Sequence, residues 1–191
     1  MEYEIQVLSL QKNKDRRQHT KEVMDSLGLN YTFFNAVKPR EVTKDMEESL
    51  FSKVDYYDWD IDQKAVMATF VSHLALLHLS YSTKCNMLVL EDDIELSDYD
   101  FDLTNIDFTS FDVFNLGTQI SCYAYFLSWQ GAGKVLDILL NKEIIKAYDW
   151  ELCELGLQNK IKYKTTSKPV WKQVDTFKSN IAPNGYKLKN K

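Results

Sequence analysis

Short apolar runs alternate with longer stretches of helical periodicity along the first two-thirds of the chain. The runs typical of strands lie at residues 5–10, 31–37, 87–90, 111–116 and 123–127, with weaker strand character at 161–164. Apolar side chains at helical spacing predict helices over residues 16–27, 65–81, 129–140 and 150–159. Strands that alternate with helices indicate an α/β domain with a mixed, mainly parallel sheet flanked by helices.

Polar and small residues predict where these helices begin and end. Asp15 and Ser128 precede two of them and are residue types that cap helix N-termini, and Gly28 is a fitting C-terminal stop. The helix at 65–81 is apolar almost all round, so we expect it to be buried. Residues 38–63 are the least regular part, where we expect a short helix and a loop.

The length and composition suit a single domain. The chain has 191 residues and 45% hydrophobic content, enough for one domain over residues 1–191 with a core of its own. It contains only 6 glycines and 3 prolines, so long flexible linkers are not expected. The tail at 186–191 is short and basic, and we expect it to be disordered.

Charge and cysteine content exclude several classes of protein. A net charge of −5 and a pI of about 5.3 do not give the basic footprint of a nucleic-acid-binding protein. The cysteines, Cys85, Cys122 and Cys153, are odd in number and have no CxxC spacing, which disfavours a disulfide framework and a zinc ribbon. The N-terminus has no signal-peptide pattern, and no apolar run approaches the ~20 residues of a membrane span. We therefore predict a cytoplasmic protein without a transmembrane segment, which would meet a membrane only at its surface.

Three adjacent carboxylates follow the apolar run at 87–90. Ligands of open α/β sheets bind beyond the carboxyl ends of the strands, where Glu91, Asp92 and Asp93 are expected. Neighbouring carboxylates repel one another and favour a bound cation, and oxygen ligands suit Mg²⁺ or Mn²⁺. The alternative is a solvated acidic turn without a metal ion.

The first strand and helix carry a second group of candidates. Ser9 and Leu10 end the strand, and Arg16 opens the helix. A helix N-terminus attracts phosphate through its free N–H groups, and an arginine adds a bidentate contact. An exposed basic helix start is the alternative for the same residues.

Further polar residues lie where apolar ones are expected. Ser72 and His73 fall inside the buried helix and need partners there; a hydrogen-bonded core histidine is the alternative to a ligand contact. No Asp or Cys stands at metal-ligand spacing from His73, which excludes a zinc site. Asp149 precedes Trp150 at a helix start, where it serves as an N-cap or as a general base.

The order of these motifs resembles glycosyltransferase family 25, which comprises lipopolysaccharide-type and collagen-type β-galactosyltransferases. The segments that carry the resemblance are 7–10 with Arg16–Arg17, 33–37, Ser72–His73, 88–93, 111–113, 116–117, 124–132, Asp149, and Pro169, Val170, Gln173 and Ser179. The sequence departs from the family pattern at Ser9, where Asn is usual, and at Ala68–Thr69, where Gly-Cys is usual.

The resemblance implies a GT-A-like (Rossmann-like) fold and a metal-dependent, inverting transfer of a sugar. The donor would be a nucleotide sugar such as UDP-galactose, the ion Mn²⁺ or Mg²⁺, and the acceptor a hydroxyl of a glycan, a lipid-linked saccharide, lipopolysaccharide or a protein. Asp149 would be the catalytic base, and Asp93 and Glu91 would hold the metal ion. The donor would contact Ser9, Leu10, Arg16, Ser72, His73 and Asp92.

Three other classes of protein are alternatives to an active glycosyltransferase. The departures at Ser9 and Ala68–Thr69 leave open a sugar-nucleotide-binding or glycan-binding protein without catalysis. A metal-dependent phosphohydrolase is disfavoured, because residues 91–93 lack Asp-x-Asp spacing and the downstream lysine of haloacid-type enzymes. A structural protein would leave the carboxylates in solvent and bind no ion. The apolar faces of Trp150 and of Tyr56, Tyr57 and Trp59 suit either a sugar ring or packing.

Overall fold

A six-stranded sheet runs through the centre of the computed structural model, which describes residues 3–51, 62–98, 100–118, 120–144, 146–174 and 177. Its strand order is β2-β1-β3-β6-β5-β7. The strands are β1 (Glu4–Ser9), β2 (Thr32–Asn35), β3 (Met87–Glu91), β5 (Val113–Asn115), β6 (Ala124–Leu127) and β7 (Tyr163–Thr165). A separate antiparallel pair is formed by β4 (Ile94–Leu96) and β8 (Trp171–Gln173).

One strand of the central sheet runs against the other five. β1 is parallel to β2 and β3, and β5 is parallel to β7, whereas β6 is antiparallel to both β3 and β5. The carboxyl ends of five strands therefore share one edge of the sheet with the N-terminal end of β6. The predicted mixed, mainly parallel sheet flanked by helices is confirmed.

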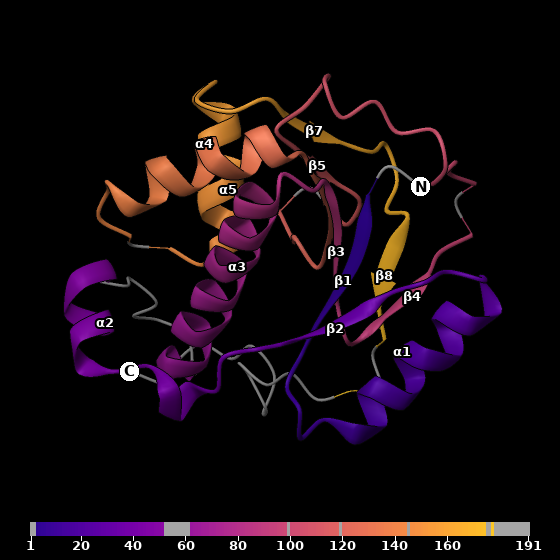
Figure 1. Ribbon diagram of the computed structural model, residues 1–191, viewed down its shortest axis with the longest axis horizontal. Coiled ribbons are helices and arrows are strands. Elements are labelled where there is room, and N and C mark those ends of the chain that lie inside the picture. The colour runs from indigo at the N-terminus through magenta and orange to yellow at the C-terminus, as the bar shows by residue number, and fades with distance from the viewer. Residues whose placement is uncertain are drawn as a thin grey trace, which may run out of the picture.

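Helices cover both faces of this sheet (Figure 1). Around the sheet are α1 (Lys14–Ser26), the 3₁₀ helix η1 (Pro39–Glu41), α2 (Lys44–Leu50), α3 (Gln63–Thr83), α4 (Trp129–Leu140) and α5 (Tyr148–Leu157). Figure 1 shows α3, α4 and α5 gathered on one side, and α1 with β4 and β8 on the other. Each face therefore has its own apolar core.

The alternation of side chains along the strands separates the two cores. On β3, Val89 packs with the α3–α4–α5 side, while Leu88 and Leu90 pack with the α1 side. The whole strand is buried up to Glu91, as expected of a central strand covered on both faces. The period of two therefore sends residues that follow one another at the end of β3 to opposite sides of the sheet.

α3 is long and apolar enough, by length and composition, to cross a membrane. More than half of that apolar stretch is buried inside the protein, where the helix packs against α4. Leu76 and Leu77 on α3 are fully buried. This is the pattern of a core helix, as the all-round apolar character of residues 65–81 predicted.

Several local predictions were wrong or incomplete. Asp15 does not cap α1, because the helix begins at Lys14 after Asn13. Asp149 does not cap α5 either: Ala147 is the N-cap residue, and Asp149 is the second residue of the helix. Ser128 does cap α4, since its hydroxyl accepts a hydrogen bond from the N–H of Gly131 at 3.1 Å.

The remaining predictions concern the cysteines and segments that lie outside the described residues. All three cysteines are free thiols, as their number and spacing indicated. Tyr56, Tyr57 and Trp59, Ser179 and the tail at 186–191 lie outside the described residues.

Candidate active site

The carboxylate cluster lies at the carboxyl edge of the sheet, where β1 and β3 end side by side. Leu8 pairs with Glu91 in the parallel ladder, so Ser9 and Asp92 emerge next to each other. Asp92 and Asp93 form the turn that leads from β3 into β4. Ligands of α/β sheets bind at this edge, because side chains from separate strand ends converge there.

Both carboxylate oxygens of Asp92 have protein partners. Oδ1 accepts from Arg16 Nη1 at 2.9 Å, and Oδ2 accepts from the Ser9 hydroxyl at 2.6 Å and from Asn13 Nδ2 at 3.2 Å. The residue is 4% exposed. Asp92 therefore holds the end of β1 and the start of α1 against the turn after β3.

Asp93 has one carboxylate oxygen to spare. Its Oδ2 accepts from Arg16 Nη1 at 3.0 Å, whereas its Oδ1 is buried and has no hydrogen-bond partner among the described residues. Burial, reinforced by the negative charge of Glu91, raises the pKa of Asp93 from 3.8 to about 6. A buried carboxylate oxygen without a donor needs a cation or a proton.

The adjacent arginines have different partners. Arg16 is buried and bridges Asp92 and Asp93. Arg17 donates from Nε to the Ser9 hydroxyl at 3.1 Å and from Nη2 to the side chain of Asn35 at 2.7 Å, and its guanidinium lies over the ring of Phe33. Arg17 thus joins β1 to β2.

His73 and Glu91 belong to the opposite side of the sheet. The His73 ring, 2% exposed, stacks on Tyr148 at 4.3 Å between centroids, and its Nδ1 lies 2.9 Å from the hydroxyl of Tyr125. Its Nε2 lies 3.7 Å from Glu91 Oε1. Burial lowers the pKa of His73 to about 4, so the ring is neutral at neutral pH.

Glu91 and Asp149 share the environment of His73. Burial and the charge of Asp92 raise the pKa of Glu91 from 4.5 to about 7. Burial also raises the pKa of Asp149 from 3.8 to about 6; Glu91 adds to this rise and His73 opposes it. Asp149 Oδ1 accepts from the Trp150 N–H at 2.9 Å. Asp149 and Glu91 therefore influence each other's charge, and both act on His73 or are acted on by it.

Two residues predicted for donor binding have structural partners instead of contacts with the carboxylates. The Ser72 hydroxyl accepts from the N–H of Val37 at 2.9 Å and donates to the carbonyl of Ala68 at 2.6 Å. Leu10 is buried, and its carbonyl accepts from the N–H of Asn13 at 2.9 Å. Ser72 therefore secures the chain after β2 to α3, and Leu10 shapes the turn before α1.

Sequence reasoning missed four residues of this arrangement. Asn13 and Arg17 support Asp92 and Ser9, and Tyr125 and Tyr148 surround His73. The paired arginines and the Ala124–Tyr125 motif signalled two of them. Nothing in the local pattern distinguishes Asn13 or Tyr148 from ordinary turn and core residues.

The carboxylate oxygens at this edge suit a divalent cation that is held by few protein ligands. Within the described part of the chain, no three His, Cys, Asp or Glu side chains group as a complete metal site. Mg²⁺ usually binds through one or two carboxylates together with substrate phosphates and water, so a complete protein cage is not required. The Oδ1 of Asp93, which has no hydrogen-bond partner in the described part of the chain, could be a protein ligand of this kind.

Comparison with known proteins defines the class of this fold and site. The family described as "Glycosyltransferase family 25 (LPS biosynthesis protein)" matches residues 3–117, more than half of the chain. The chain belongs to glycosyltransferase family 25, and it is a glycosyltransferase. As such it acts on a sugar donor and a glycan acceptor.

Other comparisons give less detail. No curated protein matches the chain significantly. Among solved structures, the crystal structure of a glycosyltransferase involved in the glycosylation of the major capsid of PBCV-1 is similar, with 11% identity and a TM-score of 0.45. The match covers 86% of this chain and 81% of that one.

Proposed function

We propose that this glycosyltransferase transfers galactose from a UDP-sugar, with inversion at the anomeric carbon and with Mn²⁺ or Mg²⁺ as cofactor. The acceptor would be a hydroxyl of a glycan, a lipid-linked saccharide such as lipopolysaccharide, or a protein. The observation that carries the proposal is the buried Oδ1 of Asp93 at the carboxyl edge of the sheet, for which the described residues provide no hydrogen-bond partner. We further propose that the protein works in the cytoplasm and meets a membrane-bound acceptor at the membrane surface.

Asp93, with Glu91 beside it, would hold the metal ion. When bound, the ion supplies positive charge that stabilises the diphosphate as it leaves. Arg16 keeps the Asp93 carboxylate in place through the 3.0 Å contact to Oδ2 and leaves Oδ1 available. Asp92 has no free oxygen in this arrangement, so its proposed part in donor binding is to orient Arg16 and Ser9.

Asp149 is the proposed general base. It takes the proton of the acceptor hydroxyl while that oxygen bonds to the anomeric carbon and the bond from this carbon to the diphosphate breaks. The raised pKa, about 6, gives the carboxylate more basicity than an exposed aspartate while leaving it mostly ionised at neutral pH. His73, neutral and fixed by Tyr125 and Tyr148, would position Glu91 beside it and so act on the donor side indirectly.

The donor itself would lie over the ends of β1 and β3. Ser9 and Leu10 lead into the turn between β1 and α1, and Arg16 is in the first turn of α1, where the positive end of the helix would attract phosphate. Ser72 supports this region from behind through Val37. These roles are proposals that follow from the position of the residues at the edge.

A donor panel tests the function directly. Purified protein is incubated with UDP-, GDP- and CMP-sugars, with and without Mn²⁺, and both binding and release of the nucleotide are measured. We expect metal-dependent hydrolysis of one UDP-sugar, and loss of this activity in Asp93→Ala. Binding without cleavage, even when acceptors are supplied, would favour a sugar-nucleotide-binding protein. No binding of any donor by folded protein would contradict the proposal.

A further inference from the structure

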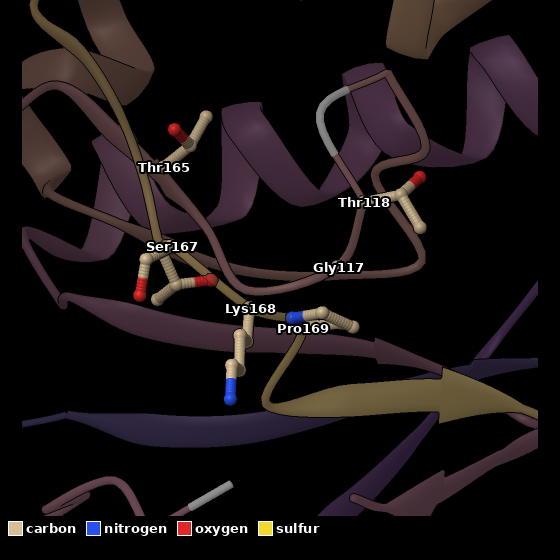
Figure 2. Close-up of a pocket in the computed structure, with 7 residues that line it drawn as sticks. Gly117, Thr118, Thr165, Ser167, Lys168 and Pro169 are labelled. Carbon is tan, nitrogen blue, oxygen red and sulfur yellow. The ribbon is translucent and has the colours of Figure 1, made fainter.

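A polar cavity lies at the same edge of the sheet as the carboxylates, beyond the ends of β5 and β7. It has a volume of about 500 Å³ and is lined by Gly117 and Thr118 on one side and by residues 165–169 on the other. Figure 2 shows Thr118 and the Thr165–Pro169 segment around this space. The function proposed above leaves this cavity without a role.

A buried asparagine outside the lining holds Gly117 and Thr118 in place. Asn115, 0% exposed, donates from Nδ2 to the carbonyl of Thr118 at 2.7 Å and to the hydroxyl of Tyr163 at 3.0 Å. Its Oδ1 accepts from the N–H of Gly117 at 2.9 Å. A Cβ at Gly117 would lie 2.6 Å from the carbonyl oxygen of Ser121, so only glycine fits there. The wall is therefore preorganised in one conformation.

The lining is rich in hydroxyl groups and carries positive charge. Thr118, Thr165, Thr166 and Ser167 contribute hydroxyls, and the Thr166 Oγ1 is buried without a hydrogen-bond partner among the described residues. Lys168 is the charged residue of the lining, which includes no described carboxylate. Lys160 and Lys162 precede β7 and Lys164 lies over the ring of Phe114, so Lys168 is the lysine that supplies positive charge to this lining. This local charge favours an anionic ligand.

The cavity is close enough to the carboxylate cluster to hold another part of the same substrate. β6 alone separates β3 from β5, and β7 is the next strand. Neighbouring strands are about 4.8 Å apart, so the strand ends at Glu91 and at the cavity are separated by about 10–15 Å. An oligosaccharide spans this distance. A bond of 2.7 Å from the Val170 N–H to the Leu116 carbonyl fixes the two walls relative to each other.

We propose that this cavity binds an anionic group, a phosphate or a carboxylate, of the saccharide acceptor. Lys168 contacts the anion, and the hydroxyls of Thr166 and Ser167 bond to it or to the neighbouring sugar hydroxyls. The inference rests on the proposed function in that it assigns the cavity to the acceptor. It adds that the enzyme selects charged acceptors over neutral ones.

Small probes test the site without requiring catalysis. Glucose 6-phosphate, glucuronate and glucose are titrated into ¹⁵N-labelled full-length protein, and the amide signals of Gly117, Thr118 and Ser167 are followed. We expect both anionic probes to shift these signals and glucose to bind at least about tenfold more weakly, as the loss of one charge-assisted hydrogen bond predicts. Equal binding of all three, or no shift at these amides, overturns the proposal.

Matched lysine variants test whether Lys168 supplies the positive charge that binds the anionic probes. Lys168→Ala should weaken the anionic probes about tenfold, and Lys168→Glu should abolish their preference over glucose. Lys172→Ala is the control: Lys172 is on β8, pairs with Glu95 and does not line the cavity, so its loss removes the same charge without an effect on the probes. If Lys168→Ala and Lys172→Ala weaken probe binding equally, the net charge of the protein explains the effect, and a specific site is contradicted.

Competition with the nucleotide distinguishes an acceptor site from a donor site. Saturating UDP with Mg²⁺, which unlike Mn²⁺ is diamagnetic and does not broaden amide signals, should leave the probe-induced shifts unchanged. Displacement of the probes by UDP would mean that the cavity binds the donor diphosphate, which overturns the acceptor assignment. Donor hydrolysis is measured on the same samples. Metal-dependent hydrolysis without probe binding contradicts the role of the cavity alone. Probe binding without cleavage of any donor, even when acceptors are supplied, contradicts the proposed function and leaves an anion site.

Discussion

Adjacent aspartates at the end of β3 have different surroundings, and this difference separates a supporting role from a ligand role. Asp92 is held by donors from Ser9, Asn13 and Arg16, so its charge is compensated inside the protein. Asp93 shares Arg16 but keeps one oxygen without a donor among the described residues. We therefore expect the loss of Asp92 and the loss of Asp93 to have different consequences.

Asp92→Ala should destabilise the fold, and Asp93→Asn should not. Without Asp92, the buried Arg16 loses one of its two carboxylates, and breaking a buried ion pair costs about 3–5 kcal/mol. Asp93→Asn keeps the shape and removes only the charge of a carboxylate whose ionisation the fold opposes. Urea unfolding measures both variants. The metal-dependent activity should be lost in Asp93→Asn, and its survival would remove Asp93 from the metal site.

The acidity of Asp149 gives a prediction with two readouts. As the base, it must be ionised, so kcat/KM should fall as pH decreases below about 6. Asp149→Asn should lower kcat about 10²–10⁴-fold, the contribution of a general base, with little change in donor affinity. An unchanged kcat would reduce Asp149 to a helix residue without a catalytic role.

The same pKa fixes the sign of a stability effect. The folded pKa of Asp149, about 6, exceeds the ordinary 3.8, so the folded state binds its proton more tightly than the unfolded state. The contribution of protonated Asp149 to the free energy of unfolding is fully present below about pH 4 and is lost as pH rises through about 6. Asp149→Asn should therefore gain stability relative to the natural protein over this interval, as measured by thermal unfolding at each pH.

At the scale of elements, close packing fixes how α4 meets the sheet. A Cβ at Gly131 would lie 2.4 Å from the carbonyl oxygen of Asp112, a backbone atom of the chain entering β5. A Cβ at Gly133 would instead meet the ring of Tyr81, which is 50% exposed. The first obstacle is rigid and the second is the end of a side chain that can move.

Two alanine substitutions in α4 should therefore differ in their effects on stability. Gly131→Ala should cost about 1–3 kcal/mol, as overpacking does when backbone must shift. Gly133→Ala should cost less or stabilise the protein, because alanine is favoured over glycine by about 1 kcal/mol in a helix interior. Equilibrium denaturation in urea compares the two, and an equal loss in both would contradict the packing argument.

Elements with strong periodicity could be predicted from the sequence, and short ones could not. The long helix at 65–81 and the apolar strand at 87–90 were identified close to the bounds of α3 and β3. β4 and β8 have three residues each and exist through their pairing with each other, which no local pattern records. The carboxylates were found as a group, but the contacts that distinguish Asp92 from Asp93 come from residues about 80 positions earlier.

At the scale of the molecule, the chain after residue 117 is an integral part of the fold. The family match ends there, yet β6 lies between β3 and β5 in the sheet. The N–H of Val174, just after β8, donates to the carbonyl of Asp93 at 2.7 Å. This late segment of the chain therefore supports the turn that carries the candidate metal ligand.

Trp171 on β8 provides a test of whether this late segment of the chain stabilises the fold. It is fully buried, so Trp171→Ala should lower the free energy of unfolding by about 3–5 kcal/mol, as other large-to-small core substitutions do. Trp150, 50% exposed on α5, is the matched control, and its replacement should change stability by less than about 0.5 kcal/mol. Similar losses for both tryptophans would contradict the structural role of β8.

The parallel pairing of β1 with β3 also bears on how the protein is made. Ser9 and Asp92 are 83 residues apart in the sequence, although their side chains share a hydrogen bond. At a synthesis rate of about 5–20 residues per second, the first strand leaves the ribosome roughly 4–17 s before its central partner. Pairing between strands so distant in sequence is also intrinsically slow. During that interval an apolar strand has no neighbour on the β3 side, so chaperones that shield nascent chains should have their largest effect on the yield of this enzyme before residue 91 emerges.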